Sequence, residues 1–348
     1  MAYTTVNKSS SFMNTKLFTG NSGTQALTGV GFQPDWTWIK ARDGTYNHHT
    51  FDAVRGVTKS VTTNESAAET TISGLTAFGT DGFTLGSNSQ TNNNSYSFAS
   101  WNWKAGTAVS GNTGGSGSYK TYTGSVNTTS GFSIIKYEGN GTNGMTIPHH
   151  LGVAPKMIIT KNLSATGDWY TYHQAVGNTK TMLLNQTNAE SGADIGFWNN
   201  TSPTSSVFSV GSSTAVNGNG NSIIAYCFAE VQGYSRIGSF TVNGNSTNMI
   251  YTGFRPSFLL MKQYSSTSGN AQWGVFDNTR AGYNGKNNFL YANTDAVADS
   301  SNAQTLDFLS NGFRLYGEYV SAQAGQSNIY YAVGQTLVGT NGITNNAR

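Results

Sequence analysis

Short apolar or alternating segments, each bounded by Gly, Asn or Ser, recur along the whole chain. This pattern is typical of strands joined by tight turns. No stretch keeps the helical period of 3.6 residues between helix caps. We therefore predict strands in three series, over residues 16–20, 36–40, 51–55, 81–86 and 96–103; then 135–139, 157–160, 169–173, 207–211 and 223–228; then 237–242, 258–261, 273–280, 311–315 and 329–333.

One phrase opens a predicted strand in each series. It consists of a Gly, two variable residues, a Pro and, six residues after the Pro, a Lys. The three copies are Gly31, Pro34 and Lys40; Gly152, Pro155 and Lys161; and Gly253, Pro256 and Lys262. The chain has only 5 prolines, and three of them occupy this one position. The repeat indicates three copies of one structural module.

The strand count defines the expected architecture. About eight strands in a module of roughly 105 residues predict an all-β chain of three tandem antiparallel β-sandwiches with jelly-roll topology. The modules are predicted at residues 1–106, 119–231 and 232–348, with a flexible Gly/Ser linker at 107–118. Gln232 and Gly233 are expected to form a tight joint. We therefore expect the second and third modules to pack as a stiff pair and the first to be tethered more loosely.

The amino-acid composition limits the classes of binding partner expected for the chain. Charged residues make up 10% of the chain and the net charge is +3, so no basic patch for nucleic acid is expected. The 12% aromatic content excludes a disordered chain. No stretch approaches the ~20 apolar residues that cross a bilayer. The first residues lack a secretory signal, so synthesis in the cytoplasm is expected.

Comparison of the copies separates core from surface. Trp36 and Trp38 correspond to Met157 and Ile159 and to Phe258 and Leu260, so size and apolarity persist while the indole does not. That substitution pattern predicts core residues. Trp101 and Trp103 correspond to Tyr226 and Phe228 and are interpreted in the same way. The single cysteine, Cys227, is expected to be a buried, inert thiol.

Charged residues also recur between the copies. The repeated lysines are expected to lay their stems along apolar surface and to keep their ammonium groups in water. Asp52 with Arg55, and Asp277 with Arg280, predict local ion pairs. The second copy carries His173 and Val176 instead.

The chemistry needed for catalysis is sparse. The doublets His48–His49 and His149–His150 lack the spacing of a zinc site. The carboxylates of Glu65, Glu69 and Glu138 form no recurring pair of the kind that a glycosidase needs. No nucleophile elbow, phosphate loop or dinucleotide fingerprint occurs in its proper context. We therefore expect no enzyme activity, no cofactor and no metal.

Two loop-like segments combine an aromatic ring that does not recur with amide side chains. An aromatic ring stacks on a sugar while amides bind its hydroxyl groups, so these segments are the candidate ligand sites. The alternative is a ring that packs against its own loop. The candidates are Trp198, Asn199 and Asn200 in the first segment, and Tyr283 and Asn284 in the second.

Several longer runs carry a family resemblance. GVGFQPDWTWIKARDG, FDAVRGVTK, DGFTLGSN and WNWKAG in the first module resemble a repeat family of marine bacteriophages, including cyanophages and pelagiphages. NNTSPTSSVFSVG, AYCFAEVQGYSRIGSF, YTGFRPSFLLMK and AVGQTLVGTNG resemble the same family. Its members are virion or tail-fibre-like proteins whose modules resemble concanavalin-type jelly rolls. The resemblance implies no catalytic residue.

The expected function is that of a non-enzymatic structural virion protein of a tailed phage. The first interpretation is a tail fibre or adhesin that binds host-surface glycan non-covalently and contacts other virion proteins. A homotrimer is expected, because phage fibres are often trimers. The alternatives are a capsid decoration or knob protein and, as an enzyme, a tailspike polysaccharide depolymerase.

Overall fold

The computed structural model describes residues 4–243, 247–265, 271–281, 288–299, 306–316 and 324–335. Almost all regular structure in these ranges consists of antiparallel strands, which confirms the predicted all-β class. The described helices are short, such as α1 (Ser89–Asn92) and α3 (Thr214–Asn217). Each of these two begins with a side chain that accepts a backbone N–H bond, as N-cap residues do.

The strands of the described residues form six sheets, which group into three pairs of one large and one three-stranded sheet. In the first pair the orders are β1-β9-β3-β4-β5-β6 and β2-β8-β7. The bounds are β1 (Met13–Thr19), β2 (Gln25–Thr28), β3 (Trp36–Ala41), β4 (His49–Asp52), β5 (Lys59–Thr62), β6 (Thr70–Thr71), β7 (Leu75–Gly79), β8 (Gly82–Leu85) and β9 (Ser97–Trp103).

The second pair has the orders β10-β12-β13-β19-β15-β16-β17 and β11-β14-β18. Its elements are β10 (Thr107–Asn112), β11 (Gly114–Gly115), β12 (Thr121–Asn127), β13 (Phe132–Glu138), β14 (Met145–Pro148), β15 (Met157–Asn162), β16 (Trp169–His173), β17 (Met182–Leu183), α2 (Ile195–Trp198), β18 (Val207–Val210) and β19 (Ser222–Phe228).

The third pair has the orders β20-β27-β22-β23-β24 and β21-β26-β25. Its elements are β20 (Ser235–Thr241), β21 (Thr247–Tyr251), β22 (Pro256–Gln263), β23 (Trp273–Asp277), α4 (Asn278–Ala281), β24 (Leu290–Tyr291), β25 (Leu306–Leu309), β26 (Gly312–Tyr316) and β27 (Ser327–Gly334). The central order of its large sheet matches β1-β9-β3-β4-β5 in the first pair and β13-β19-β15-β16-β17 in the second.

The segment 107–118, predicted to be a flexible linker, is instead largely paired. Its strand β10 pairs with β12 along the edge of the second large sheet, and β11 pairs with β14 in the small sheet. Ladder hydrogen bonds outweigh the Gly/Ser composition of the segment. The joint at Gln232–Gly233 is a turn as expected, with Gly233 at φ 73° and Tyr234 N–H donating to Val231 O. The domain boundaries themselves stay a prediction.

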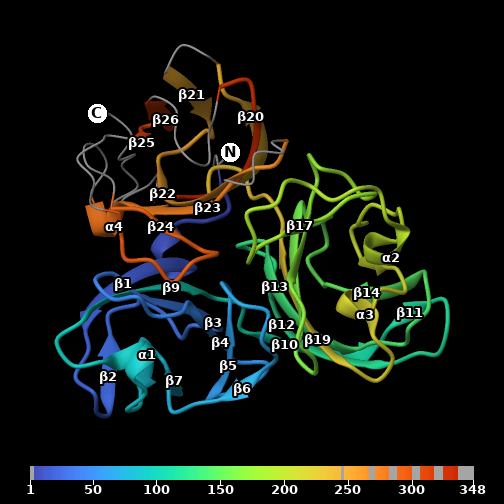
Figure 1. The fold of residues 1–348 in the computed structure, drawn as a ribbon, viewed down its shortest axis with the longest axis horizontal. Coiled ribbons are helices and arrows are strands. Elements are labelled where there is room, and N and C mark those ends of the chain that lie inside the picture. Colours follow the sequence, from blue (N-terminus) through green and yellow to red (C-terminus); the bar gives the residue numbers. More distant parts are fainter. Residues whose placement is uncertain are drawn as a thin grey trace.

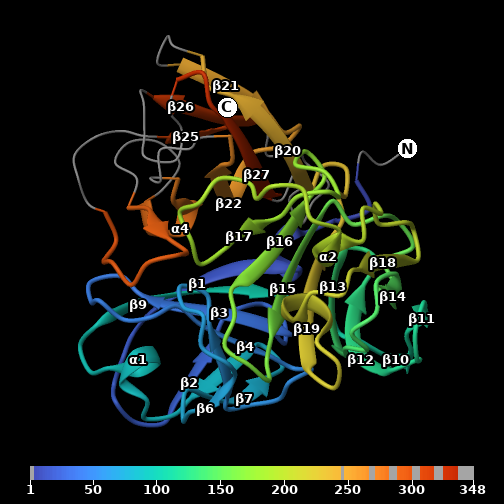
Figure 2. The same ribbon diagram turned by 45° about the vertical axis from the view of Figure 1, so that its right-hand side comes forward.

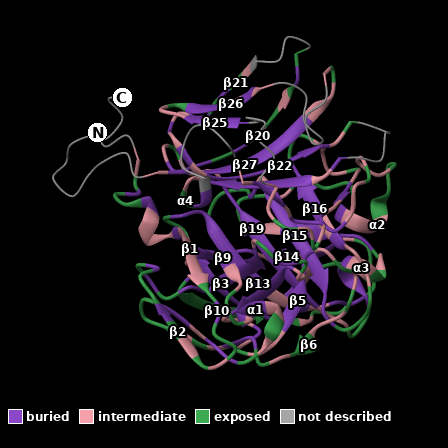
Figure 3. Cartoon of the chain, turned by 60° about the vertical axis from the view of Figure 1, so that its left-hand side comes forward, coloured by how far each residue is buried: buried purple, intermediate pink, exposed green. Residues whose placement is uncertain are grey.

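Each sheet pair encloses its own core, and a fourth core lies where the three large sheets meet. The private cores contain Phe83 and Phe98, Ile135 and Phe208, or Leu259 and Phe313. The shared core takes residues from every large sheet. Figures 1 and 2 show the three lobes around this centre, and Figure 3 shows buried residues concentrated there.

The shared core explains the sequence pattern of the central strands. Every residue of β3 and of β15 is buried, because one face packs on the small sheet and the other on the neighbouring large sheets. A strand buried on both faces reads as a continuous apolar run rather than as an alternation. The apolar stretches after the three prolines therefore form strands that pack in the core shared by the three large sheets.

Each of the three junctions between sheet pairs contains an equivalent backbone hydrogen bond. Glu69 N–H donates to Leu163 O (3.1 Å), Glu190 N–H to Tyr264 O (2.9 Å) and Ala298 N–H to Arg42 O (2.7 Å). These bonds join the first pair to the second, the second to the third, and the third to the first. The expectation of a loosely tethered first module is therefore wrong, because its contacts with both neighbours match the contact between those neighbours.

Candidate functional site

The three repeated lysines lie at these junctions. Lys40, Lys161 and Lys262 are each 0% exposed, so the expectation of an ammonium group in water is wrong. Every ammonium donates to two backbone carbonyl oxygens. The acceptors are Ala41 (2.6 Å) and Gly44 (3.0 Å) for Lys40, Ser66 (2.9 Å) and Gly167 (2.5 Å) for Lys161, and Gln186 (3.0 Å) and Ala271 for Lys262.

Two of the lysines link neighbouring sheet pairs. Lys161 reaches from the second pair to Ser66 of the first, and Lys262 reaches from the third pair to Gln186 of the second. Burial lowers the pKa of Lys161 to about 8 and that of Lys262 to about 7. The carbonyl oxygens replace the water that each ammonium gives up on burial. These lysines fasten the junctions, and none of them faces solvent.

The rest of the repeated phrase shapes the turn before each lysine strand. Gly31, Gly152 and Gly253 have φ values of 93°, 75° and 86°, which favour glycine. Pro34, Pro155 and Pro256 are buried at or just before the strands that carry the lysines. The phrase therefore has a structural role in all three copies.

The aromatic residues that the sequence assigned to the core are buried. Trp36, Trp38, Trp101 and Trp103 are all within the shared core, which confirms that prediction. Trp36 stacks on Tyr226 of the second sheet pair, with ring centroids 4.4 Å apart. The ring faces are thus covered by protein and are closed to a sugar.

Two further tryptophans bond across the junctions. Trp169 Nε1–H donates to Thr62 O (2.7 Å), from the second pair to the first, and Trp273 Nε1–H donates to Leu183 O (2.8 Å), from the third pair to the second. His48 occupies the corresponding position in the first pair. Its Nδ1 accepts a hydrogen bond from Trp38 Nε1–H (2.9 Å).

The predicted ion pairs exist and are buried. Asp52 pairs with Arg55, and Asp277 pairs with Arg280 at 2.5 Å. Each acid also binds a neighbouring sheet pair. The Asp52 carboxylate accepts from Tyr226 Oη–H (2.7 Å), and the Asp277 carboxylate accepts from Trp101 Nε1–H (2.9 Å). The pairs hold junctions as well as their own turns.

Three equivalent asparagines have a structural role that was not predicted from the sequence. Asn64, Asn185 and Asn293 accept from the backbone N–H groups of His48 (2.8 Å), Trp169 (3.0 Å) and Trp273 (2.9 Å) through their Oδ1 atoms. The signal was present: Asn64 follows Lys40, and Asn185 follows Lys161, at the same spacing in the sequence. Because the chain is rich in Asn, one equal Lys-to-Asn spacing is also expected by chance and does not stand out in the sequence.

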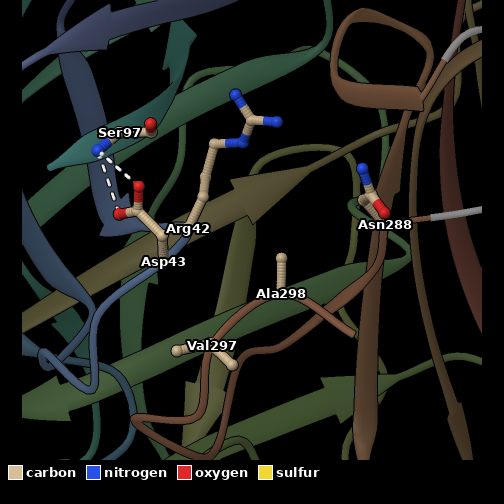
Figure 4. Close-up of a pocket in the computed structure, with 6 residues that line it drawn as sticks. All are labelled: Arg42, Asp43, Ser97, Asn288, Val297 and Ala298. Atoms are coloured by element: carbon tan, nitrogen blue, oxygen red, sulfur yellow. Dashed lines mark hydrogen bonds between the residues drawn. The ribbon is translucent and has the colours of Figure 1, made fainter. Parts of the chain in front are cut away.

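Clefts open where the junctions reach the surface. The cleft between the first and second pairs has a volume of about 450 Å³ and is lined by Asn64, Glu65, Ser66, Ala67, Thr166, Asn185 and Gln186. The cleft between the third and first pairs, about 390 Å³, is lined by Arg42, Asp43, Ser97, Asn288, Val297 and Ala298 (Figure 4). A smaller one of about 250 Å³ includes Asp35, Val54 and Ser125.

The candidate ring Trp198 lies in a core and offers no stacking surface. It ends α2, is 1% exposed and packs edge-on against Tyr172, with centroids 5.7 Å apart. The helix begins because the Asp194 carboxylate accepts from Gly196 N–H (2.7 Å), and this turn directs the indole inward. The prediction that Trp198 contacts a sugar is therefore wrong.

The other candidates do not assemble around that ring. Asn199 and Asn200 continue the chain in left-handed conformation, at φ 51° and 48°. Asn199 bonds to Thr201, which fits a helix end better than a ligand site. Tyr283 and Asn284 lie outside the described residues.

The acidic residues considered for catalysis are each engaged elsewhere. Glu65 accepts from Asn47 Nδ2–H (2.8 Å), Glu69 lies 3.4 Å from Arg55 and Glu138 lies 2.7 Å from Lys120. Among the described residues no group of three His, Cys, Asp or Glu side chains is placed to hold a metal. Cys227 is buried, which raises the pKa of its thiol to about 12, as expected for an unreactive residue.

A family model described as a domain of unknown function, DUF7483, matches residues 8–336. The chain therefore belongs to the DUF7483 family, whose single domain covers all three sheet pairs. No curated protein and no solved structure matches the chain. In the part of the chain that the structure describes, no helix has both the length and the apolar character to span a membrane.

Proposed function

We propose that the chain is a non-enzymatic structural protein of a tailed-phage virion that contacts host-surface glycan by non-covalent binding. The resemblance of its repeated runs to marine phage virion proteins supports the virion assignment. Placement in the tail, as a fibre or adhesin, is part of the same proposal.

One observation carries the binding role: the cleft between the first and second sheet pairs. It is lined by side chains with amide and hydroxyl groups, among them Asn64, Ser66, Thr166 and Gln186. Such groups both donate and accept hydrogen bonds, as sugar hydroxyl groups require. The cleft has the size of a small-ligand site.

The walls of this cleft are held before any ligand arrives. Asn185 donates to Asp168 (2.7 Å) and accepts from Trp169 N–H (3.0 Å), and the shared core lies beneath the cleft. A rigid site loses little conformational entropy on binding. Because an isolated sugar contact is weak, attachment would need several copies of the chain, and a homotrimer is the proposed state.

A second candidate function is capsid decoration, as a knob that binds other virion proteins. Its support is the closed arrangement of the sheet pairs around one core, which suits a compact knob better than an extended fibre. A tailspike depolymerase has less support, since Glu65 stands in the cleft without a second carboxylate beside it among the described lining residues.

Electron cryomicroscopy of the intact virion tests the placement. Density for three sheet pairs per chain at the tail, in threefold symmetry, is the expected result. Density spread over the capsid shell would reject the attachment role in favour of decoration. Analytical ultracentrifugation of the purified chain tests the trimer independently.

Binding of the labelled protein to host cells tests the activity. Saturable binding that soluble host glycan competes away is expected, with no new reducing ends in the glycan. Substituting Ser66 and Thr166 together with Ala should reduce the binding, whereas the change Tyr119→Ser, at an exposed residue outside the cleft, should not. Release of reducing ends would overturn the non-enzymatic assignment.

A further inference from the structure

Arg42 is a cation with a buried nitrogen and no carboxylate partner among the described residues. Its Nε is buried without a hydrogen-bond acceptor among the described residues. None of the ion pairs between described residues includes it, whereas Arg55 and Arg280 each bind a carboxylate. A buried donor left unsatisfied costs about 1–3 kcal/mol, and an unsatisfied group in a folded protein needs an explanation.

The fold itself does not require an arginine at this position. The junction bond that Arg42 O accepts is accepted by Leu163 O and by Tyr264 O at the two matching junctions. Leu163 belongs to the shared core, and Tyr264 packs against it. An apolar side chain serves at both of those sites, so the guanidinium of Arg42 has another purpose.

The guanidinium extends into the cleft between the third and first sheet pairs. Figure 4 shows it directed away from the Asp43 carboxylate, with Asn288 on the other side of the cleft. Asp43 is already engaged, since its two oxygens accept from Ser97 N–H at 2.9 and 3.1 Å. Val297, 45% exposed, and Ala298 supply apolar surface at the same cleft.

We propose that this cleft binds the anionic group of an acidic sugar, either a uronate carboxylate or a sulfate half-ester. This proposal rests on the proposed glycan-binding function and names the class of glycan. The two Nη groups of Arg42, rather than its buried Nε, bind two oxygens of the anion side by side. The Asn288 amide bonds to a ring hydroxyl group, and Val297 covers an apolar face of the sugar.

The neighbouring charges favour a singly charged group. The carboxylate of Asp43 lines this cleft beside Arg42. A phosphate dianion would bring a second negative charge toward that carboxylate. A carboxylate or a sulfate half-ester carries one charge, which Arg42 neutralises.

The Nε–Hε resonance of Arg42 in a ¹⁵N-correlated NMR spectrum tests the proposal directly. We expect it to shift on titration with sodium glucuronate or galactose 6-sulfate and not with glucose, and the sugar that moves it identifies the anionic group. Sodium sulfate alone should act more weakly than galactose 6-sulfate. Equal shifts with glucose, equal shifts with sulfate alone, or no shift with either acidic sugar would overturn the proposal.

The matched variant is Arg42→Leu, which places at the third junction the residue type that Leu163 provides at the first. Because Leu163 is accommodated there, the variant should fold and bind the acidic sugar at least about tenfold more weakly. Full affinity in this variant would reject the site even if the wild type binds. A wild type that attaches to host cells through neutral glycan but shows no shift with either acidic sugar refutes only this proposal, whereas a wild type that never binds cells refutes the proposed function.

Discussion

The junction between the first and second sheet pairs and the junction between the second and third use the same lysine and tryptophan bonds but different acid–base groups. At the first junction the Asp52 carboxylate binds Arg55 and accepts from Tyr226 Oη–H. At the second junction His173 takes the place of the acid, with its Nδ1 accepting from Ala175 N–H (3.2 Å). Val176 takes the place of the arginine and packs against the shared core.

The comparison distinguishes the contacts that are common to both junctions from the acid–base group that differs between them. Backbone bonds, buried lysines and large apolar residues recur at both junctions, so they define the arrangement. The acid–base group varies, because a buried ion pair and a neutral ring both fit the same space when their polar atoms are bonded. The two junctions should therefore respond differently to mutation and to pH.

Breaking a buried ion pair should give the largest effect. In Arg55→Met the Asp52 carboxylate stays buried, with Tyr226 as its remaining partner across the junction, so we expect a loss of about 4 kcal/mol in the free energy of unfolding. Arg280→Met should cost a similar amount at the third junction. Urea denaturation at neutral pH measures both losses.

The second sheet pair supplies the control for this prediction. Changing Asp52→His and Arg55→Val together installs the pair found at His173 and Val176. It leaves no fully buried charge unpaired, because Glu69, which loses Arg55 as a partner, is partly exposed. This double variant should be more stable than Arg55→Met alone. If the double variant is the less stable of the two, the acid–base groups are not interchangeable.

Acid should weaken the second junction next. Burial lowers the pKa of His173 to about 4, from 6.5. Between pH 6.5 and 4 the unfolded chain therefore binds a proton that the folded chain does not, so stability falls as the pH falls. His173→Gln should remove about 3 kcal/mol of this acid-induced loss, as measured by urea denaturation at several pH values.

Other groups set the background of that measurement. His49 and His149, whose pKa values are lowered by burial to about 4, contribute in the same direction. Asp35 opposes them, because burial raises its pKa to about 6 and its protonation in acid stabilises the fold. His150→Gln, at an exposed residue, is the control and should change the profile less. Equal changes from both substitutions would contradict the assignment to the junction.

Matched tryptophan substitutions test whether the two junctions share their architecture. Trp169→Phe leaves Thr62 O without its indole donor, and Trp273→Phe does the same to Leu183 O. We expect each to lower the free energy of unfolding by about 2 kcal/mol, through the lost hydrogen bond and lost volume. Thermal and urea denaturation should show similar losses in the free energy of unfolding for the two variants. A large difference would mean that the junctions are not equivalent.

The sequence predicted what depends on neighbours along the chain. Strands, turns at Gly233 and the repeated glycines, and the i,i+3 ion pairs all follow from local spacing. The core assignment of Trp36 and Trp38 succeeded because the copies could be compared with one another. Size and apolarity had been retained while the indole changed, and burial is the physical reason for such a pattern.

The sequence could not show what packs on the far face of each strand. A strand-end lysine normally reaches water, but Lys262 meets the third-to-second junction and is buried there. The contact between Ala298 and Arg42 joins residues far apart in the chain, so no local pattern indicates it. The prediction for Trp198 was wrong for a related reason, because a one-turn helix directs its ring into the core.

Substitution of Trp198 should give the smallest effect and sharpens the contrast between a private core and a junction. Its Nε1 is buried without a hydrogen-bond partner among the described residues, so Phe loses volume but no bond. We expect Trp198→Phe to cost about 1 kcal/mol, less than Trp169→Phe, and to leave glycan binding unchanged. Denaturation in urea and a host-cell binding assay measure the two quantities. Loss of binding in a stably folded Trp198→Phe variant would restore this ring as a ligand contact, and would mean that α2 opens when the glycan binds.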